Sequence, residues 1–178
     1  MPLQTATFGA GCFWCLDAAM NHLNGVKQAL SGYMGGEANL ANYQDVCSGK
    51  SGHAEVVQVV FEPSIISFEQ LCLIFFSLHD PTQLNRQGND IGSQYRSAIF
   101  YHCQNQLAVA ELLIKKLTEQ AVFKQSIVTA LTPVSEFFVA EKQHQNYFQQ
   151  HPEQGYCQMI IAPKMAKFRQ QYADLLKS

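Results

Sequence analysis

The chain has 178 residues, of which 47% are hydrophobic and 15% charged, as expected for one globular domain with a core of its own. Twelve Lys and Arg against fourteen Asp and Glu leave a net charge of -2, and no run of five basic residues occurs, so we expect neither a nucleic-acid nor a membrane partner. The chain starts without a charged n-region or an apolar leader, and its longest apolar run, 72–78, is too short to span a bilayer. We therefore expect a cytoplasmic protein with reduced cysteines.

Strands and helices are predicted to alternate from the start of the chain. Residues 3–8 alternate loosely and indicate a short strand. Apolar residues then recur at helical spacing, which predicts a helix from near Cys12 to before Gly25. A second strand is expected at 26–33, followed by a polar, ordered loop at 37–53.

The middle of the chain repeats this alternation. The β-branched run 56–61 is apolar on both faces, which predicts a buried central strand. Ser67 and Gln70 have the spacing of a capping box at the start of a helix. A second polar loop is expected at 79–94, and 95–101 is a further strand candidate.

The last third is predicted to hold a helix at 107–121, a strand pair at 127–139, a helical stretch at 141–150 and a closing helix at 162–176. The order strand, helix, strand, strand, helix, strand is that of a ferredoxin-like two-layer sandwich. We therefore predict an α+β fold with such a core, long ordered loops and a C-terminal extension. No repeat or linker divides the chain, so residues 1–178 are expected to form a single domain.

The densest chemical signal is the pair Cys12 and Cys15 at the expected start of the first helix. A thiol at a helix N-terminus meets unpaired N–H groups and the positive end of the helix dipole, which should lower its pKa and favour the thiolate. Phe13 and Trp14, the only Trp of the chain, would offer an aromatic wall to a substrate. Inert packing is the ordinary role of a buried cysteine, but the strand–glycine–helix context favours a reactive Cys12.

Two other interpretations of the Cys-x-x-Cys spacing stay open. The first is half of a structural zinc site, for which the sequence offers no second cysteine pair. The remaining cysteines are dispersed along the chain: Cys47, Cys72, Cys103 and Cys157. The second is a thioredoxin-like disulfide exchanger, although Phe and Trp stand where such a loop prefers small turn formers.

The polar loops supply further candidates. Glu55 stands at the mouth of the apolar strand, where desolvation would raise its pKa and suit a general acid near neutral pH. A solvated strand end is the alternative for this residue. Tyr43, Asp90 and Tyr95 are hydrogen-bonding groups in loops otherwise built of small residues, and each alone is more typical of a surface or packing position.

These residues lie in stretches that resemble the A-type methionine sulfoxide reductases. The matching stretches, in the family's order, are GCFWC (11–15), SGYMGG (31–36), YQDVCSG (43–49), GHAE (52–55), HDPT (79–82), NRQGNDIGSQYRS (85–97) and AEKQHQNY (140–147). They span most of the chain from residue 8 to about residue 164, and so many motifs in one order are not expected by chance.

The resemblance implies an enzyme that reduces methionine-S-sulfoxide, free or in proteins, and so repairs oxidative damage. Cys12 would attack the sulfoxide sulfur and become a sulfenic acid, while Phe13 and Trp14 hold the methyl group. Glu55 would protonate the sulfoxide oxygen. The residues implied to support this oxygen are Tyr43 and Tyr95, by hydrogen bonds, and Asp90, by ordering the polar side. No metal or organic cofactor is implied; the resemblance implies a monomer that thioredoxin, as external dithiol, would recycle.

The sequence departs from the family pattern at the thiols expected to form a disulfide with Cys12. Cys15 stands where many members have Gly, and Cys157 matches the first tail cysteine but lacks the glycines and second cysteine that follow it elsewhere. We favour Cys157 over Cys15 as the resolving thiol, because its segment is expected to be mobile whereas Cys15 lies on a rigid helix. The rival of another class is a thiol sensor, which needs Cys12 but no proton donor.

Overall fold

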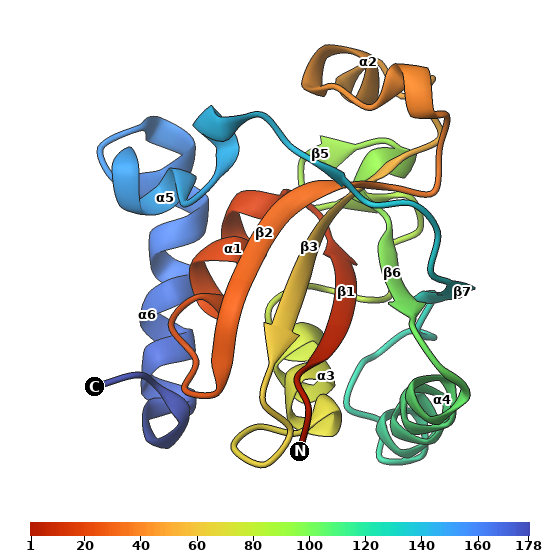
Figure 1. Cartoon of the computed structure of the whole chain (residues 1–178), viewed down its shortest axis with the longest axis vertical. Coiled ribbons are helices and arrows are strands. Elements are labelled where there is room, and N and C mark those ends of the chain that lie inside the picture. Colours follow the sequence, from red (N-terminus) through yellow and green to blue (C-terminus); the bar gives the residue numbers. More distant parts are fainter.

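The computed structural model describes all residues, 1–178, and its centre is a six-stranded sheet in the order β7-β6-β1-β3-β2-β8 (Figure 1). The strands of this sheet are β1 (Gln4–Ala10), β2 (Val26–Met34), β3 (Ala54–Phe61), β6 (Ser97–Tyr101), β7 (Ala130–Pro133) and β8 (Phe138–Val139). All neighbours are antiparallel except β6 and β7, which are parallel. A separate hairpin is formed by β4 (Arg86–Gln87) and β5 (Asp90–Ile91).

Six α-helices accompany the sheet. They are α1 (Phe13–Met20), α2 (Tyr43–Cys47), α3 (Phe68–Ser77), α4 (Gln104–Glu119), α5 (Tyr147–Gln150) and α6 (Ala162–Gln171). Short 3-10 turns lie at Ala38–Leu40, Ser93–Tyr95, Lys142–His144 and Ala173–Leu175, and a π-helical turn at Cys157–Ile161 leads into α6. The prediction of a mixed α+β fold is confirmed, and none of the helices has the length and apolar character needed to cross a membrane.

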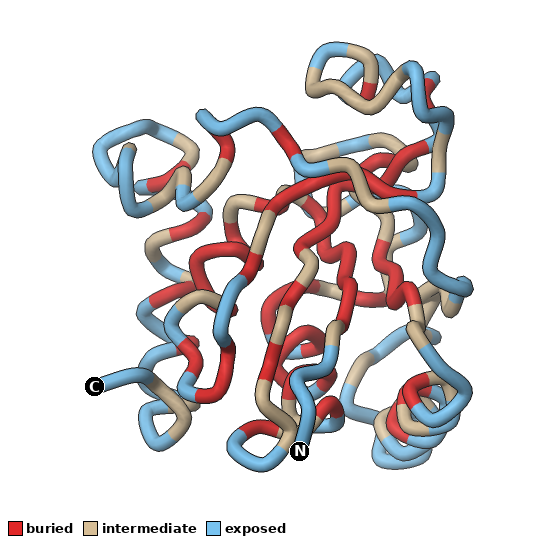
Figure 2. The backbone as a smooth tube through the Cα atoms, in the orientation of Figure 1, coloured by how far each residue is buried: buried red, intermediate tan, exposed pale blue.

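The main core lies between one face of the sheet and the helices α1, α3 and α6, and most residues of the central strands and of α1 are buried (Figure 2). Phe8 of β1 stacks on Phe68 and Phe75 of α3, with ring centroids 6.0 and 5.1 Å apart. Val56 and Val57 of β3 are both fully buried on opposite faces, as predicted for a central strand. Burying both faces of β3 explains why its sequence is a continuous apolar run.

The capping box before α3 is present as predicted. Gln70 N–H donates to Ser67 Oγ at 3.1 Å, and Ser67 N–H donates to Gln70 Oε1 at 2.9 Å. These two bonds satisfy donors that the first turn of a helix leaves free, so the helix begins at a fixed residue.

The strand pair predicted at 127–139 is wrong in its pairing. Two strands form there, but β7 joins β6 at one edge of the sheet and β8 joins β2 at the opposite edge. The connection crosses the second face, where the Phe137 ring lies so close to Gly32 that a Cβ at this glycine would be 2.3 Å from it. The chain therefore spans the sheet at this point instead of forming a hairpin.

The helix predicted at 141–150 is broken into two short turns. Asn146 between them has a left-handed backbone with φ 52, and its N–H donates to the buried carboxylate of Asp17 at 2.8 Å. A single αL residue interrupts a helix. This tertiary contact, with a residue 129 positions away, overrides the local helical pattern.

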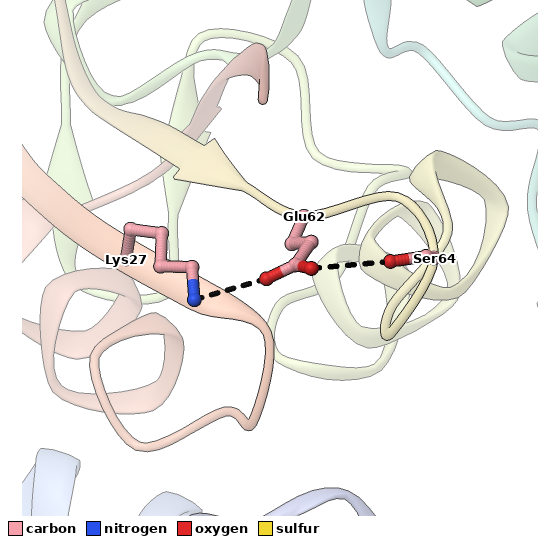
Figure 3. Close-up of polar contacts among 3 residues, drawn as sticks. All are labelled: Lys27, Glu62 and Ser64. Atoms are coloured by element: carbon pink, nitrogen blue, oxygen red, sulfur yellow. Dashed lines mark hydrogen bonds and ion pairs between the residues drawn. The ribbon is translucent and has the colours of Figure 1, made fainter. Parts of the chain in front are cut away.

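An exposed cluster ties the far ends of β2 and β3 together. Lys27 Nζ lies 2.9 Å from Glu62 Oε2, and Ser64 Oγ donates to the other carboxylate oxygen of Glu62 (Figure 3). Because Lys27 hydrogen-bonds this carboxylate, the pKa of Glu62 is lowered from its ordinary value. This behaviour is the ordinary one for a solvated glutamate with a cationic partner.

Candidate active site

A tight turn that requires glycine connects the end of β1 to Cys12. β1 ends at Ala10, Gly11 has φ 85, and Cys12 is the N-cap of α1. A Cβ on Gly11 would lie 2.8 Å from Cβ of Gln87 in the β4–β5 hairpin, so both the backbone angle and the packing exclude a side chain. The turn fixes Cys12 at the beginning of the helix, as the sequence predicted.

Cys12 opens into a cavity of about 370 Å³. Three predicted site residues, Cys12, Cys15 and Asp90, line it together. The other lining residues are Ala10, Gln87, Gly88, Asn89, Tyr156, Ile160 and Lys164. The α1 N-terminus, the β4–β5 hairpin and the C-terminal helix therefore form three walls of one site.

Glu55 lies behind Cys12 and is 1% exposed. The backbone N–H of Phe13 donates to its Oε1 at 3.1 Å. Burial raises the pKa of Glu55 to about 8, with a further increase from the charge of Asp90 and a partial decrease from the Phe13 hydrogen bond. Glu55 is thus mostly protonated at neutral pH, in contrast to Glu62 at the solvated end of the same strand. The alternative of a solvated strand end is wrong for Glu55.

The thiol of Cys12 does not have the lowered pKa that its position at the helix start predicted. Burial raises this pKa well above the ordinary value, and the nearby Glu55, Cys15 and Asp90 raise it further. The backbone N–H of Trp14 lowers it only in part. Desolvation outweighs the effect of the helix N-terminus, so Cys12 is a thiol at neutral pH.

Asp90 is joined to the C-terminal wall of the cavity. Tyr156 Oη donates to Asp90 Oδ2 at 2.6 Å, and burial followed by nearby negative charges raises the pKa of Tyr156. The next residue, Cys157, begins the π-helical turn. The hydrogen bond therefore fastens the start of the C-terminal helix to the hairpin that faces Cys12.

Tyr43 and Tyr95 are brought together around a third cysteine. Burial raises the pKa of the Cys47 thiol, and the side chains of these two tyrosines beside it lower that pKa. Burial raises the pKa of both tyrosines, and the charges of Glu55 and Cys12 raise these pKa values further. Both tyrosines thus lie within electrostatic reach of the catalytic candidates, although they do not line the cavity with Cys12.

An aromatic stack surrounds Trp14. The indole lies 3.7 Å from the Tyr147 ring, nearly parallel to it, and its Nε1–H donates to His144 Nδ1 at 3.2 Å. The His144 ring lies 4.2 Å from that of Tyr43, and its buried Nε2 has no hydrogen-bond partner. Phe13, the other residue predicted to hold the substrate, is 1% exposed and packs inside this stack rather than on its surface.

Two carboxylates, the buried Asp17 and the exposed Glu141, hold the segment that supplies this stack. Asp17 accepts hydrogen bonds from Asn146 N–H at 2.8 Å and Ser31 Oγ at 3.1 Å, and burial raises its pKa to about 6. Glu141 accepts from Tyr33 Oη and from the backbone N–H of Tyr43, each at 2.9 Å. Residues 141–147 are therefore fixed against α1, β2 and α2 at once.

The two candidate resolving thiols are both buried. Cys15 is 4% exposed and Cys157 is fully buried in the main core. Cys157, expected on a mobile segment, begins a π-helical turn and belongs to the main core. The charge of Cys15 raises the pKa of Cys12, and the charge of Cys157 raises the pKa of Cys15. Burial raises the pKa of Cys15 to about 11, and the Lys164 ammonium lowers it in part.

The model of the family described as peptide methionine sulfoxide reductase matches residues 4–176. The chain belongs to this family. As a peptide methionine sulfoxide reductase it is an oxidoreductase, and the resemblance seen in its motifs is confirmed.

The peptide methionine sulfoxide reductase MsrA of a Psychrobacter species is 51% identical over 176 residues, which cover 98% of this chain and 99% of that protein. The structure of Mxr1 from Saccharomyces cerevisiae in reduced form matches with a TM-score of 0.81 and 32% identity, over 87% of this chain and 89% of the yeast chain. Mxr1 in complex with Trx2 shares the fold at a TM-score of 0.57 and 24% identity, over 82% and 84% of the two chains.

In this peptide methionine sulfoxide reductase, the sequence motifs did not single out four residues of the site. They are His144, Tyr147, Tyr156 and Lys164. The signal for the first two was the stretch 140–147, in which a histidine and a tyrosine three positions apart can share one side of a turn. Nothing local marks Tyr156 or Lys164, because only the packing of the C-terminal helix on α1 brings them to Cys12. No group of three or more His, Cys, Asp or Glu is placed to hold a metal ion.

Proposed function

We propose that the protein reduces methionine-S-sulfoxide, free or within proteins, through a sulfenic acid on Cys12. The observation that carries the proposal is Glu55, buried beside the first turn of α1 and accepting a hydrogen bond from the N–H of Phe13 at 3.1 Å. A carboxyl group with a pKa of about 8 can give a proton to an oxygen that develops negative charge at neutral pH. A thiol that only senses oxidants needs no such donor.

The first step joins Cys12 to the sulfoxide. Cys12 loses its proton to solvent as the substrate docks, and its sulfur attacks the sulfoxide sulfur. Glu55 transfers its proton to the sulfoxide oxygen, and the resulting hydroxyl passes to the Cys12 sulfur as the new S–S bond and the substrate's S–O bond break, which gives the Cys12 sulfenic acid and methionine. Tyr43 and Tyr95 hydrogen-bond the oxygen, and Asp90 orders the polar side.

The methyl group of the substrate rests on Trp14. The indole is held flat by Tyr147 and oriented by the hydrogen bond to His144. Phe13 supports this wall from inside the core and presents its N–H to Glu55. A fixed aromatic partner for the methyl and a fixed proton donor for the oxygen leave room for one epimer, which accounts for the S preference.

The second step forms an intramolecular disulfide. The structure supports Cys15 over Cys157 as the thiol that condenses with the Cys12 sulfenic acid, because Cys15 lines the same cavity. An N-cap residue and the residue three positions later lie on the same side of the first turn, which lets two sulfurs approach. The products are the Cys12–Cys15 disulfide and one water molecule. Cys157, next to Cys15, can then exchange into the disulfide.

We assign the recycling of this disulfide to thioredoxin, and the yeast relative Mxr1, which has been solved in complex with Trx2, supports that assignment. The proposal further includes a monomer that consists of one catalytic domain, 1–178, works in the cytoplasm and needs no cofactor beyond the external dithiol. We also propose a ferredoxin-like classification for the core, supported by the strand order β6-β1-β3-β2 with α1 and α3 as the connecting helices.

A single turnover tests the proposal. Reduced protein receives excess methionine-S-sulfoxide without reductant, and methionine and disulfides are then quantified. We expect about one methionine per chain, with Cys12 in a disulfide to Cys15. The Cys15→Ser and Cys157→Ser variants show which thiol resolves the sulfenic acid. A wild-type protein that forms no methionine while Cys12 remains alkylatable would leave the thiol sensor as the better function.

A further inference from the structure

A second, larger cavity lies beside the one that contains Cys12. Its volume is about 720 Å³, and it is bounded by the end of α3, the residues after α4 and the outer face of α6. Gln87 and Lys164 line both cavities. The two cavities therefore share a wall, and a chain that enters the first can continue into the second.

One face of the C-terminal helix runs along both cavities. Ile160 lines only the first, Lys164 lines both, and Lys167, Phe168 and Gln171 line only the second. Relative to Ile160 these positions are 4, 7, 8 and 11 residues later, which is the spacing of a single stripe along a helix. The stripe leads from the vicinity of Cys12 outward along α6.

The second cavity combines an apolar floor with unpaired positive charge. Phe76 and Phe168 at its base are each 3% exposed. Lys164 and Lys167 form no ion pair and no side-chain hydrogen bond. Asp80 is the one acidic residue of the lining, and its Oδ1 already accepts hydrogen bonds from Thr82 N–H at 3.0 Å and Oγ1 at 2.6 Å.

We propose that this second cavity binds the polypeptide next to an oxidised methionine and favours a substrate with acidic residues about three positions from the sulfoxide. The inference rests on the proposed function, since it assigns a protein segment to a site adjoining the reactive thiol. The sulfur of a bound methionine sulfoxide meets Cys12 at the edge of the first cavity, and from there an extended chain advances about 3.3 Å per residue. A cavity of 720 Å³ accepts about three such residues.

The positive charges of Lys164 and Lys167 favour an acidic peptide segment in the second cavity. An acidic side chain three residues from the sulfoxide would meet Lys167, which is exposed and has no ion-pair partner, while an apolar neighbour rests on Phe168. A basic segment would be repelled by two ammonium groups. Free methionine sulfoxide is too short to reach Lys167, so its reduction should not depend on that residue.

The test compares synthetic peptides that carry one methionine-S-sulfoxide between Gly and Ser spacers, with two Asp or two Lys placed three residues before or after it. In low salt we expect kcat/KM to be about fivefold higher for the best Asp peptide than for its Lys counterpart, and the difference to shrink at high salt. Lys167→Glu should abolish or reverse the preference. Lys115→Glu on α4 makes the same change in net charge outside both cavities and should retain it.

Free methionine-S-sulfoxide serves as the internal reference, because it should be reduced equally by the wild type, Lys167→Glu and Lys115→Glu. Equal kcat/KM for the Asp and Lys peptides, or a preference that Lys167→Glu leaves intact, would overturn the inference while reduction of the free amino acid upholds the proposed function. Failure to reduce either the free amino acid or any peptide would overturn the proposed function itself and this inference with it.

Discussion

The N–H of Phe13 donates to Glu55 Oε1 across 3.1 Å, so the first turn of α1 and the start of β3 are joined directly behind Cys12. This bond holds the carboxyl group in place without ionising it, since burial outweighs the hydrogen bond in setting its pKa. Phe13, the first residue of α1, therefore also positions Glu55, the proposed proton donor.

Glu55→Gln should lower the rate of sulfoxide reduction by about 100-fold or more, because a glutamine cannot supply the proton. Its Oε1 can still accept from Phe13 N–H, so the fold and the alkylation of Cys12 should be retained. Steady-state turnover and iodoacetamide labelling measure the two properties. The control is Glu62→Gln, an exposed glutamate just after the same strand, which should keep full activity. An active Glu55→Gln enzyme would remove Glu55 from the mechanism.

The pH profile of the first turnover should show a plateau that starts near pH 8. Below the Glu55 pKa of about 8, the rate should rise with pH as Cys12 ionises. Between pH 8 and the raised pKa of Cys12, the rate should stay constant, because the fraction of protonated Glu55 falls as fast as the fraction of Cys12 thiolate rises. In Glu55→Gln the much lower rate should continue to rise through pH 8. Stopped-flow single turnovers at a series of pH values measure this, and identical profile shapes for both proteins would contradict it.

Tyr156→Phe removes the hydrogen bond of 2.6 Å to Asp90 and should loosen the start of the C-terminal helix. We expect the free energy of unfolding to fall by about 1–2 kcal/mol. Cys157, the next residue, should be alkylated several times faster in the native protein. Tyr172→Phe, whose hydroxyl makes no hydrogen bond, is the matched control and should change neither quantity. An unchanged alkylation rate for Cys157 in Tyr156→Phe would mean that the bond does not restrain this segment.

Asp17→Ala leaves the N–H of Asn146 and the hydroxyl of Ser31 without their acceptor. We expect a loss of about 2 kcal/mol in unfolding free energy, measured by urea denaturation. Because residues 141–147 carry the rings that orient Trp14, KM for the sulfoxide should also rise. Asp174→Ala, an exposed aspartate near the C-terminus, should have no effect on either measurement. A stable variant with unchanged KM would show that the segment is held by other contacts.

Local patterns predicted the elements whose structure is decided locally. The α3 helix begins where Ser67 and Gln70 form their capping box, and β3 occupies the apolar run as expected. The α2 helix and the β4–β5 hairpin were predicted only as loops, because each is short and depends on contacts with other elements. The break at Asn146 was missed for the same reason: its partner Asp17 is 129 residues away.

In the site too, features set by local sequence were predicted, whereas features set by distant contacts were not. Motifs identified Cys12, Cys15 and Asp90, which the structure brings to one cavity. The raised pKa of Glu55 was predicted from its place at the mouth of a buried strand, whereas the raised pKa of Cys12 was not. A helix N-terminus can be inferred from sequence, but the depth of a thiol in a cavity depends on walls that only the complete fold supplies.

The placement of β7 and β8 on opposite edges has a consequence for synthesis. Both strands belong to the last third of the chain, and each pairs with what would otherwise be an unprotected edge, β6 on one side and β2 on the other. A nascent chain that has not yet released residue 130 from the ribosome therefore exposes two strand edges at once, and such edges can pair with other chains. We therefore expect this enzyme to be most prone to aggregation before residues 130–139 have left the ribosome.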